Sequence, residues 1–418
     1  MRAQIEGSLA VARAVAQCRP EVICAYPITP QTHIVEGLAA MVKAGELKQC
    51  EFINVESEFG ALSVAIGSSA AGARTYTATS SQGLLFMAEA VYNASGLGLP
   101  IVMTIGNRAI GSPINIWNDH SDSMSMRDSG WIQLHAETNQ EAADLHILAF
   151  RLAEELSLPV MVCMDGFILT HAYEGVDLTE PDQVDAFLPP YEPRQVMDPM
   201  EPISIGAMVG PEAFMEVRYL NHAKQLQALE LIPKLSEKFQ KAFGRDSGGL
   251  LKPYRTEGAE TVVVALGSVN GTIQDVVDEM REQGVPIGSV SVCSYRPFPL
   301  DALREALQGA KRVVVIEKSL AVGLGGIFAA DVRKALAGTG IPVFTVIAGL
   351  GGRPIPMASL RKLFGKAMME ELEPVHFLDL RWDLVEKQLE RERTVRRSGP
   401  VAESVLKDAG ETTPRLHG

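Results

Sequence analysis

The sequence predicts an α/β protein built on largely parallel sheets. Over about the first 170 residues, apolar stretches of strand length alternate with helical stretches, which is typical of a parallel sheet covered by helices. A second alternating series begins near Glu260. Because 418 residues exceed what one ordinary hydrophobic core accommodates, two to three domains are expected.

The first series contains apolar runs bounded by small, polar or acidic residues. We expect strands at 21–25, 50–55, 74–78, 100–105 and 159–164. The helix that follows Glu58 is rich in Ala, Ser and Gly. Such small side chains allow close approach of a neighbouring helix, a subunit or a ligand, or tight packing inside the domain, and the pattern does not distinguish these alternatives.

The middle of the chain changes in character. Residues 173–211 contain seven prolines, which disfavour a regular helix or a central strand. We therefore expect an extended arm that lies on this subunit or on a partner. An amphipathic helix is expected over 212–243 and a linker over 244–252.

The second series resembles the first in its alternation of apolar and helical stretches. Expected strands lie at 261–266, 285–292, 312–316 and 343–347, with a helix at 272–283. The last ~50 residues are charged and helical in pattern and end in a polar, frayed tail.

Composition limits the class of partner. Hydrophobic residues make up 46% and charged residues 21%, which is typical of a globular protein, and the net charge of −13 argues against nucleic acid or an anionic membrane surface as the main partner.

The sequence has neither an apolar run of ~18 residues nor the order of a signal peptide, so a cytoplasmic location is expected. The five cysteines form no Cys-x-x-Cys pair, which favours buried thiols over a cluster or zinc held by this chain alone.

Several conspicuous patterns are better explained by structure than by chemistry. Gly-Leu-Gly-Gly at 323–326 lacks the full dinucleotide spacing, because position 328 is Phe, so a tight turn is favoured. Asn-Asp-His-Ser-Asp at 118–122 favours a hydrogen-bonded turn that caps the next helix over a metal site or triad. Asp165 follows Met and therefore misses the Gly-Asp-Gly pattern of magnesium diphosphate sites, and His171 is expected to be structural.

Three loops of the first series form the candidate site. They span 25–32, 54–58 and 78–84, each at an expected strand end, where α/β folds bind ligands. Glu58 enters an apolar helix, and a carboxylate is costly to bury there without a partner. A cofactor or a second subunit is the expected partner.

Arg108 directly follows an expected strand and belongs to the same edge. A guanidinium can hold a carboxylate through two parallel hydrogen bonds, which lysine cannot reproduce. We therefore favour a role in substrate binding over a salt bridge to a local acid. Short-range donors to the same pocket are expected from Thr29, Ser80, Ser81 and Gln82.

These strings resemble the α subunit of 2-oxoacid:ferredoxin oxidoreductases. The matching segments occur in order over nearly the whole chain, excepting about the last 50 residues. They are Tyr-Pro-Ile-Thr-Pro at 26–30, Glu-Ser-Glu at 56–58, Ala-Gly-Ala-Arg-Thr at 71–75, Thr-Ser-Ser-Gln-Gly-Leu at 79–84, Asn-Asp-His-Ser-Asp at 118–122, Asp-Gly-Phe at 165–167, Tyr-Arg-Pro-Phe-Pro at 295–299 and Gly-Leu-Gly-Gly-Arg at 349–353.

The resemblance implies a thiamine diphosphate-binding fold. Residues 1–235 would form its pyrimidine-type domain, including the Pro-rich arm 173–211, and 258–365 a transketolase C-terminal-like α/β domain, followed by a helical, polar tail at 366–418. The cofactor would lie between this chain and a β subunit that holds the diphosphate and Mg²⁺. It would be bound here by Pro27, Ile28, Glu58, Ser80, Ser81 and Gln82.

The resemblance also implies catalytic roles. Glu58 corresponds to the glutamate that hydrogen-bonds the aminopyrimidine ring, Thr29 to the threonine beside the substrate, and Arg108 to the arginine that receives the substrate carboxylate. Electrons would pass to [4Fe–4S] clusters in partner subunits, the β subunit and a small ferredoxin-like δ subunit, beside a γ subunit, and coenzyme A would take the acyl group.

The sequence does not decide which 2-oxoacid is the substrate, and it leaves two other functional classes as alternatives. Pyruvate is the common substrate of this family, but 2-oxoglutarate, branched, indole-containing and phenyl 2-oxoacids or oxalate are used by relatives, and residues 110–117 are candidates for tuning this choice. The final electron acceptor is ferredoxin or NAD. The alternatives to the redox enzyme are a non-redox thiamine-dependent lyase or transferase subunit and a non-catalytic scaffold.

Overall fold

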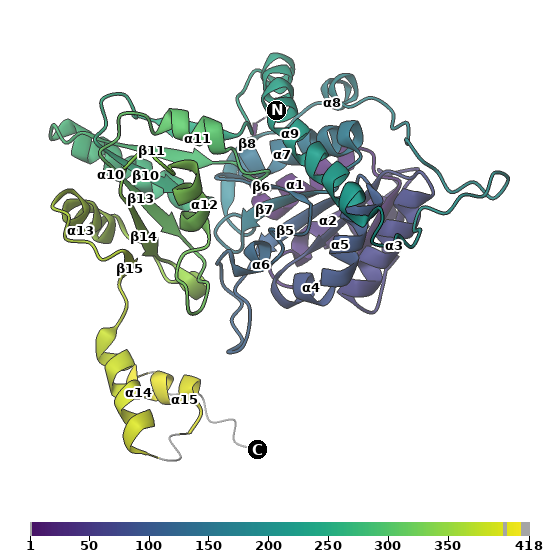
Figure 1. Cartoon of the computed structure of the whole chain (residues 1–418). Coiled ribbons are helices and arrows are strands. Elements are labelled where there is room, and N and C mark those ends of the chain that lie inside the picture. The colour runs from purple at the N-terminus through teal and green to yellow at the C-terminus, as the bar shows by residue number, and fades with distance from the viewer. Residues whose placement is uncertain (1, 396–398, 411–418) are drawn as a thin grey trace.

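The computed structural model describes residues 2–395 and 399–410. Two α/β units lie side by side, and a pair of helices, α14 (Trp382–Thr394) and α15 (Val401–Asp408), extends away from the second unit (Figure 1). The sequence-based expectation of an α/β protein with parallel sheets is confirmed. None of the described helices combines the length and apolarity needed to cross a membrane.

The first sheet has the order β12-β6-β7-β5-β4-β2-β3 in the described chain, and only β12 runs antiparallel to its neighbour. Its strands are β2 (Val22–Ala25), β3 (Glu51–Asn54), β4 (Thr75–Thr79), β5 (Val102–Asn107), β6 (Ile132–His135), β7 (Val160–Asp165) and β12 (Ser294–Arg296). The edge strand β12 comes from the second half of the sequence, so the two units share a sheet edge.

Helices cover both faces of this sheet, as apolar strands require. One face packs against α1 (Gly7–Gln17), α2 (Thr32–Lys43), α7 (Asn139–Leu156) and the long α9 (Phe214–Phe243). The other face packs against α3 (Glu58–Ala70), α4 (Ser81–Phe86) and α5 (Ala88–Leu97). A short helix, α6 (Ser121–Ser125), lies beyond the carboxyl end of β5.

The second sheet has the order β15-β14-β13-β10-β11-β9, with β9 antiparallel. Its strands are β9 (Leu251–Tyr254), β10 (Thr261–Ala265), β11 (Ile287–Val292), β13 (Arg312–Glu317), β14 (Val343–Ile347) and β15 (Val375–Phe377). Helices α10 (Val269–Glu282) and α13 (Met357–Met368) cover one face, and α11 (Leu300–Ala306) and α12 (Phe328–Ala335) the other.

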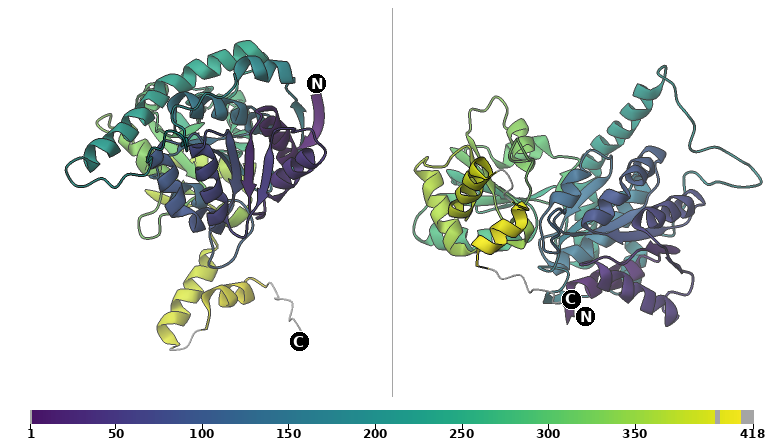
Figure 2. Two further views of the ribbon diagram at one scale, coloured as in Figure 1. Left: turned by 90° about the vertical axis from the view of Figure 1, so that its right-hand side faces the viewer. Right: turned by 90° about the horizontal axis from the view of Figure 1, so that it is seen from below.

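The Pro-rich segment is more regular than its composition predicts. It begins with β8 (Tyr173–Asp177), which pairs antiparallel with β1 (Arg2–Glu6), and continues with α8 (Pro181–Phe187). The expectation of no helix was wrong here because Pro181 occupies the first helical turn, where its missing N–H has no intrahelical acceptor to lose. Beyond it, residues 188–213 contain no helix or strand and form a loop that stands out from the body (Figure 2).

The C-terminal segment also differs in part from the prediction. Two helices are present, as expected, but β15 extends the second sheet beyond position 365. Its three residues are too few for an alternating pattern to be recognised. The predicted fraying of the last residues, 411–418, lies outside the described chain.

Candidate active site

The candidate site is built on the carboxyl edge of the first sheet. Because β2, β3, β4 and β5 are parallel, the loops that follow them leave at the same edge. Contacts between these loops are direct. The Arg108 Nη1 donates to the Thr29 carbonyl at 2.9 Å, and a Cβ added at Gly106 would lie 3.1 Å from Ser80 Oγ and 3.4 Å from Pro30 Cγ.

Glu58 is the first residue of α3 and is 8% exposed. Ser57 begins the helix by accepting a hydrogen bond from the Gly60 N–H at 3.0 Å, and the positive end of the helix dipole favours a carboxylate there. The side chain lies against α4, because a Cβ added at Gly83 would be 2.7 Å from Glu58 Oε1. Within the described chain the carboxylate makes no hydrogen bond or ion pair, so it is available to a ligand.

Buried hydroxyls without partners lie beside this acid. Thr79 Oγ1 and Ser80 Oγ are fully enclosed and have no hydrogen-bond partner among the described residues. Thr79 Oγ1 would be 2.6 Å from a Cβ at Gly83, the same position that Glu58 contacts. Because unsatisfied buried polar atoms are uncommon and costly, these atoms favour a polar ligand at this edge.

Ser81 and Gln82 are engaged with the loop that follows β5. Ser81 Oγ lies 2.5 Å from the Ala109 carbonyl and also contacts Gln82 Oε1. The Gln82 amide lies beside Gly111, where an added Cβ would be 2.5 Å from Nε2. Both side chains therefore hold residues 109–111 against α4.

Arg108 is 7% exposed and has no carboxylate partner within the described chain. Its Nε donates to the Asn115 carbonyl and its Nη1 to the Thr29 carbonyl, both at 2.9 Å. Burial lowers the pKa of the guanidinium, and the nearby Asp122 carboxylate acts in the opposite direction. The alternative of a local salt bridge is not realised among the described residues, none of which hydrogen-bonds Nη2. The Thr29 side chain itself is exposed.

Asp122 connects these loops and was not predicted as a site residue. It is fully buried and accepts from Ser81 N (2.9 Å), Arg108 N (3.0 Å), Asn107 Nδ2 (2.8 Å) and Ser123 N (2.8 Å). Burial raises its pKa to about 6, against these hydrogen bonds, which lower it. The hydrogen-bonded turn predicted for 118–122 is present, since Asp119 Oδ1 accepts from the Ser121 N–H at 3.0 Å, but the N-cap residue of α6, His120, makes no side-chain capping bond. No local sequence pattern predicted the hydrogen bonds between Asp122 and the backbone of Ser81 and Arg108.

A buried polar cluster joins the two units behind the site. Asp165 accepts from Lys318 Nζ at 2.8 Å, and its Oδ1 lies 2.6 Å from His120 Nε2. Lys318 Nζ also donates to Asn118 Oδ1 at 2.7 Å. Burial alone would raise the pKa of Asp165, but Lys318 and His120 hold it well below its usual range. Asp165 is thus committed to the interface between the units.

The cysteines and a large cavity lie apart from this chemistry. All five cysteines are free and buried, as predicted, and burial raises the pKa of Cys24 to about 12. A cavity of about 930 Å³ is lined mainly by α1, α2 and α7, and none of the predicted site residues lines it. This cavity is therefore separate from the candidate site.

The chain matches two protein-family models. Residues 13–237 match the thiamine diphosphate-binding domain of pyruvate flavodoxin/ferredoxin oxidoreductase, and residues 259–360 match core domain II of pyruvate:ferredoxin oxidoreductase. The fold and these matches thus define a thiamine diphosphate-binding α/β protein.

Curated relatives agree with this class. The chain is 45% identical over 390 residues to pyruvate synthase subunit PorA of Methanosarcina barkeri, covering 91% of this chain and 97% of that protein. It is 44% identical over 376 residues to the same subunit of Thermotoga maritima, covering 88% and 94%. Ketoisovalerate oxidoreductase subunit VorA of Pyrococcus horikoshii is 38% identical over 374 residues, covering 89% and 93%.

A solved structure has the same fold. The 2-oxoglutarate:ferredoxin oxidoreductase from Magnetococcus marinus, with 2-oxoglutarate, coenzyme A and succinyl-CoA bound, superimposes with a TM-score of 0.71 at 18% identity. The alignment covers 89% of this chain and 65% of that one. The chain belongs to the 2-oxoacid:ferredoxin oxidoreductase family and is a subunit of a multi-subunit oxidoreductase.

Proposed function

We propose that this chain is the α subunit of a thiamine diphosphate-dependent enzyme that oxidatively decarboxylates pyruvate to acetyl-CoA and CO₂. The observation that supports this most directly is the buried Glu58 carboxylate, which lies on the same sheet edge as the buried Arg108 guanidinium. Neither group forms an ion pair with any described residue of the chain. An acid for the cofactor and a cation for a substrate carboxylate are the two charges that this reaction requires of the chain.

The residues present fit the aminopyrimidine end of thiamine diphosphate. Glu58 offers a carboxyl group to a ring nitrogen, and the unpartnered hydroxyls of Thr79 and Ser80 offer further polar contacts. Pro27 and Ile28, in the neighbouring loop, offer apolar contacts. Asp165, the acid nearest to a diphosphate-binding sequence pattern, is occupied by Lys318 and His120. We therefore assign the diphosphate and Mg²⁺ to a β subunit.

The cofactor, when bound, supplies the electron sink for decarboxylation. Glu58 holds a proton at the pyrimidine nitrogen and so sets the protonation state of the ring. Arg108 receives the 2-oxoacid carboxylate through Nη2, while the Thr29 and Asn115 carbonyls keep the guanidinium in place. Asp122 accepts hydrogen bonds from the backbone N–H groups of both Arg108 and Ser81. It therefore keeps the substrate-binding loop and the cofactor-binding loop in a fixed position relative to each other.

The surface around Glu58 supports completion of the site by a second chain. Phe59 is 39% exposed and Phe86 is 60% exposed, and their rings lie 6.4 Å apart on neighbouring helices. Tyr26, in the first loop, is 38% exposed. Large apolar side chains grouped beside a polar site are typical of an interface.

The remaining steps require other subunits. Because the cysteines of this chain are buried and scattered, we assign the [4Fe–4S] clusters to the β subunit and a ferredoxin-like δ subunit. A γ subunit completes the assembly, with coenzyme A as acyl acceptor. Pyruvate is proposed because the pyruvate synthase subunits are the more identical relatives, at 42–45% against 38% for the ketoisovalerate subunit.

The test is the activity of the native complex. We expect the complex containing this chain to hold iron and to reduce viologen with coenzyme A and pyruvate, faster than with 2-ketoisovalerate, 2-oxoglutarate, phenylglyoxylate or indolepyruvate. A faster rate with another 2-oxoacid would contradict pyruvate as the substrate, but it would still agree with the proposed type of reaction. Absence of both iron and coenzyme A-dependent reduction would contradict the redox function and favour a non-redox thiamine enzyme.

A further inference from the structure

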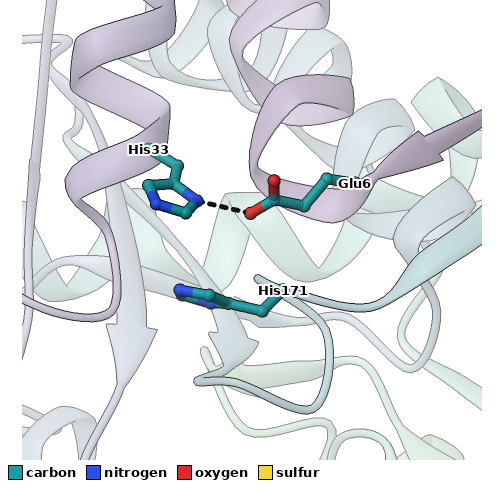
Figure 3. Close-up of side chains that lie close together, drawn as sticks. All are labelled: Glu6, His33 and His171. Atoms are coloured by element: carbon teal, nitrogen blue, oxygen red, sulfur yellow. Dashed lines mark hydrogen bonds and ion pairs between the residues drawn. The ribbon is translucent and has the colours of Figure 1, made fainter.

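We infer that Glu6, His33 and His171 form a binding site for one divalent transition-metal ion of the zinc class. Their three candidate ligand atoms lie within 4.8 Å of one another (Figure 3). They come from three separate segments: the residue that ends β1, the first turn of α2 and the loop between β7 and β8. Ligands that converge from separate segments in this way are compatible with a metal site.

The two imidazoles and one carboxylate suit a metal ion that is intermediate between hard and soft, such as zinc. Two imidazoles and one carboxylate are the protein ligands of many three-ligand zinc sites, in which a water or another small ligand takes the fourth position. Oxygen-only cations such as Mg²⁺ and Ca²⁺ are disfavoured by two nitrogen donors. Within the described chain, Glu6 pairs with no lysine or arginine, and its hydrogen-bond partner is His33 Nδ1 at 2.6 Å.

The second histidine is oriented for binding. His171 Nδ1 lies 2.7 Å from Thr170 Oγ1, which itself accepts from the Phe167 N–H at 2.8 Å. A ligating histidine usually binds the metal through one nitrogen and hydrogen-bonds through the other, so this contact leaves Nε2 for the ion.

The metal-free geometry requires only small side-chain movements. The imidazoles face each other with ring centroids 4.8 Å apart, and Glu6 approaches His33 from the side (Figure 3). Zinc bonds of about 2.0–2.2 Å place neighbouring donors farther apart than the 2.6 Å hydrogen bond, so Glu6 and His33 must separate slightly as His171 turns inward. The His33 side chain is 45% exposed, which leaves space for this movement.

The ion would fix the loop that contributes Thr29. His33 lies four positions after Thr29 in the chain, at the start of α2. On the other side, the Phe167 ring packs on His171 at 4.7 Å, and a Cβ at the adjacent Gly166 would be 2.6 Å from Pro30 Cγ. An occupied site therefore ties β1, α2 and the loop after β7 together behind Thr29 and Pro30.

The test uses the full-length chain, treated with chelator and titrated with ZnCl₂ by calorimetry. We expect one zinc ion with a micromolar or tighter dissociation constant, weakened about 100-fold or more by His33→Ala and by His171→Ala. His222→Ala removes an exposed histidine on α9 and should change nothing. Co²⁺ should give a visible absorption band that the two cluster variants lack, with unchanged circular dichroism as the control for folding.

Two outcomes would overturn the proposal. Millimolar or undetectable zinc binding would show that the cluster is only a hydrogen-bonded contact between segments. Tight binding that persists in both histidine variants would place the ion elsewhere. Neither outcome depends on the enzyme's activity, so this test is separate from that of the proposed function.

Discussion

Lys318, from the end of β13, and Asp165, from the end of β7, form a buried ion pair with Nζ and Oδ2 2.8 Å apart. Their side chains are 5% and 1% exposed, and they come from the two different units. His120 on the other carboxylate oxygen completes the cluster. A buried charge pair of this kind is costly to leave half-formed, so it specifies how the units are joined.

Asp165→Asn should destabilise the protein by about 3–5 kcal/mol, because it leaves the Lys318 ammonium buried without a counter-charge. The double variant Asp165→Asn/Lys318→Met removes both charges and should recover most of the loss. Denaturant midpoints of the two variants measure this. If Asp165→Asn were as stable as the wild type, the proposed structural role of the pair would be wrong.

Asp122 should make stability depend on pH. Burial raises its pKa from an ordinary 3.8 to about 6, so between these values the folded chain binds more protons than the unfolded chain. Its contribution to stability is therefore lost as pH rises through that window. The melting temperature of the wild type should fall more between about pH 4 and pH 6 than that of Asp122→Asn, which cannot titrate. An equal fall in the melting temperatures of the two proteins would contradict the raised pKa of Asp122.

Glu58→Gln should reduce turnover by about 10²–10⁴-fold, because an amide cannot exchange a proton with the pyrimidine ring. Binding of the cofactor should be partly retained, since the amide keeps the shape and one acceptor. Steady-state assays and cofactor titration of the reconstituted complex separate the two effects. Glu56→Gln, at an exposed position two residues away, is the matched control and should retain full turnover.

Arg108→Lys should raise the KM for the 2-oxoacid by roughly tenfold or more with a smaller change in kcat. Lysine keeps the charge but loses the planar fork that donates to a carboxylate while holding the Thr29 and Asn115 carbonyls. Initial rates over a range of 2-oxoacid concentrations give both constants. An unchanged KM would exclude Arg108 from carboxylate binding.

Gly83→Ala should weaken cofactor binding, because the new methyl group would lie 2.7 Å from Glu58 Oε1 and 2.6 Å from Thr79 Oγ1. One of these side chains must then move. The control is Gly96→Ala in α5, where a Cβ meets nothing within 4 Å. Fluorescence titration with thiamine diphosphate on the reconstituted complex should show a higher dissociation constant for the first variant only.

Most of the parallel strands could be predicted from the sequence, because the expected strand runs coincide with β2, β3, β4, β5, β7, β10, β11, β13 and β14. Other strands, such as β6, β12 and β15, could not. β12 has three residues, and its partner β6 lies about 160 positions earlier in the chain. Strand prediction depends on the periodicity of apolar residues along the chain, and three residues are too few to show a period.

For the site, local chemistry alone pointed to Glu58 and Arg108, since a carboxylate in an apolar helix and an arginine at a strand end are unusual in themselves. Contacts across long sequence separations were decided only by the tertiary structure. Asp122 reaches back to Ser81, Lys318 to Asp165, and His171 to His33. The loops that carry Asp122 and Ser81, and those that carry His171 and His33, meet because parallel strands bring distant loops to one sheet edge. Lys318 and Asp165 follow strands of different sheets and meet because the two units pack together. No spacing along the chain encodes which of these segments meet.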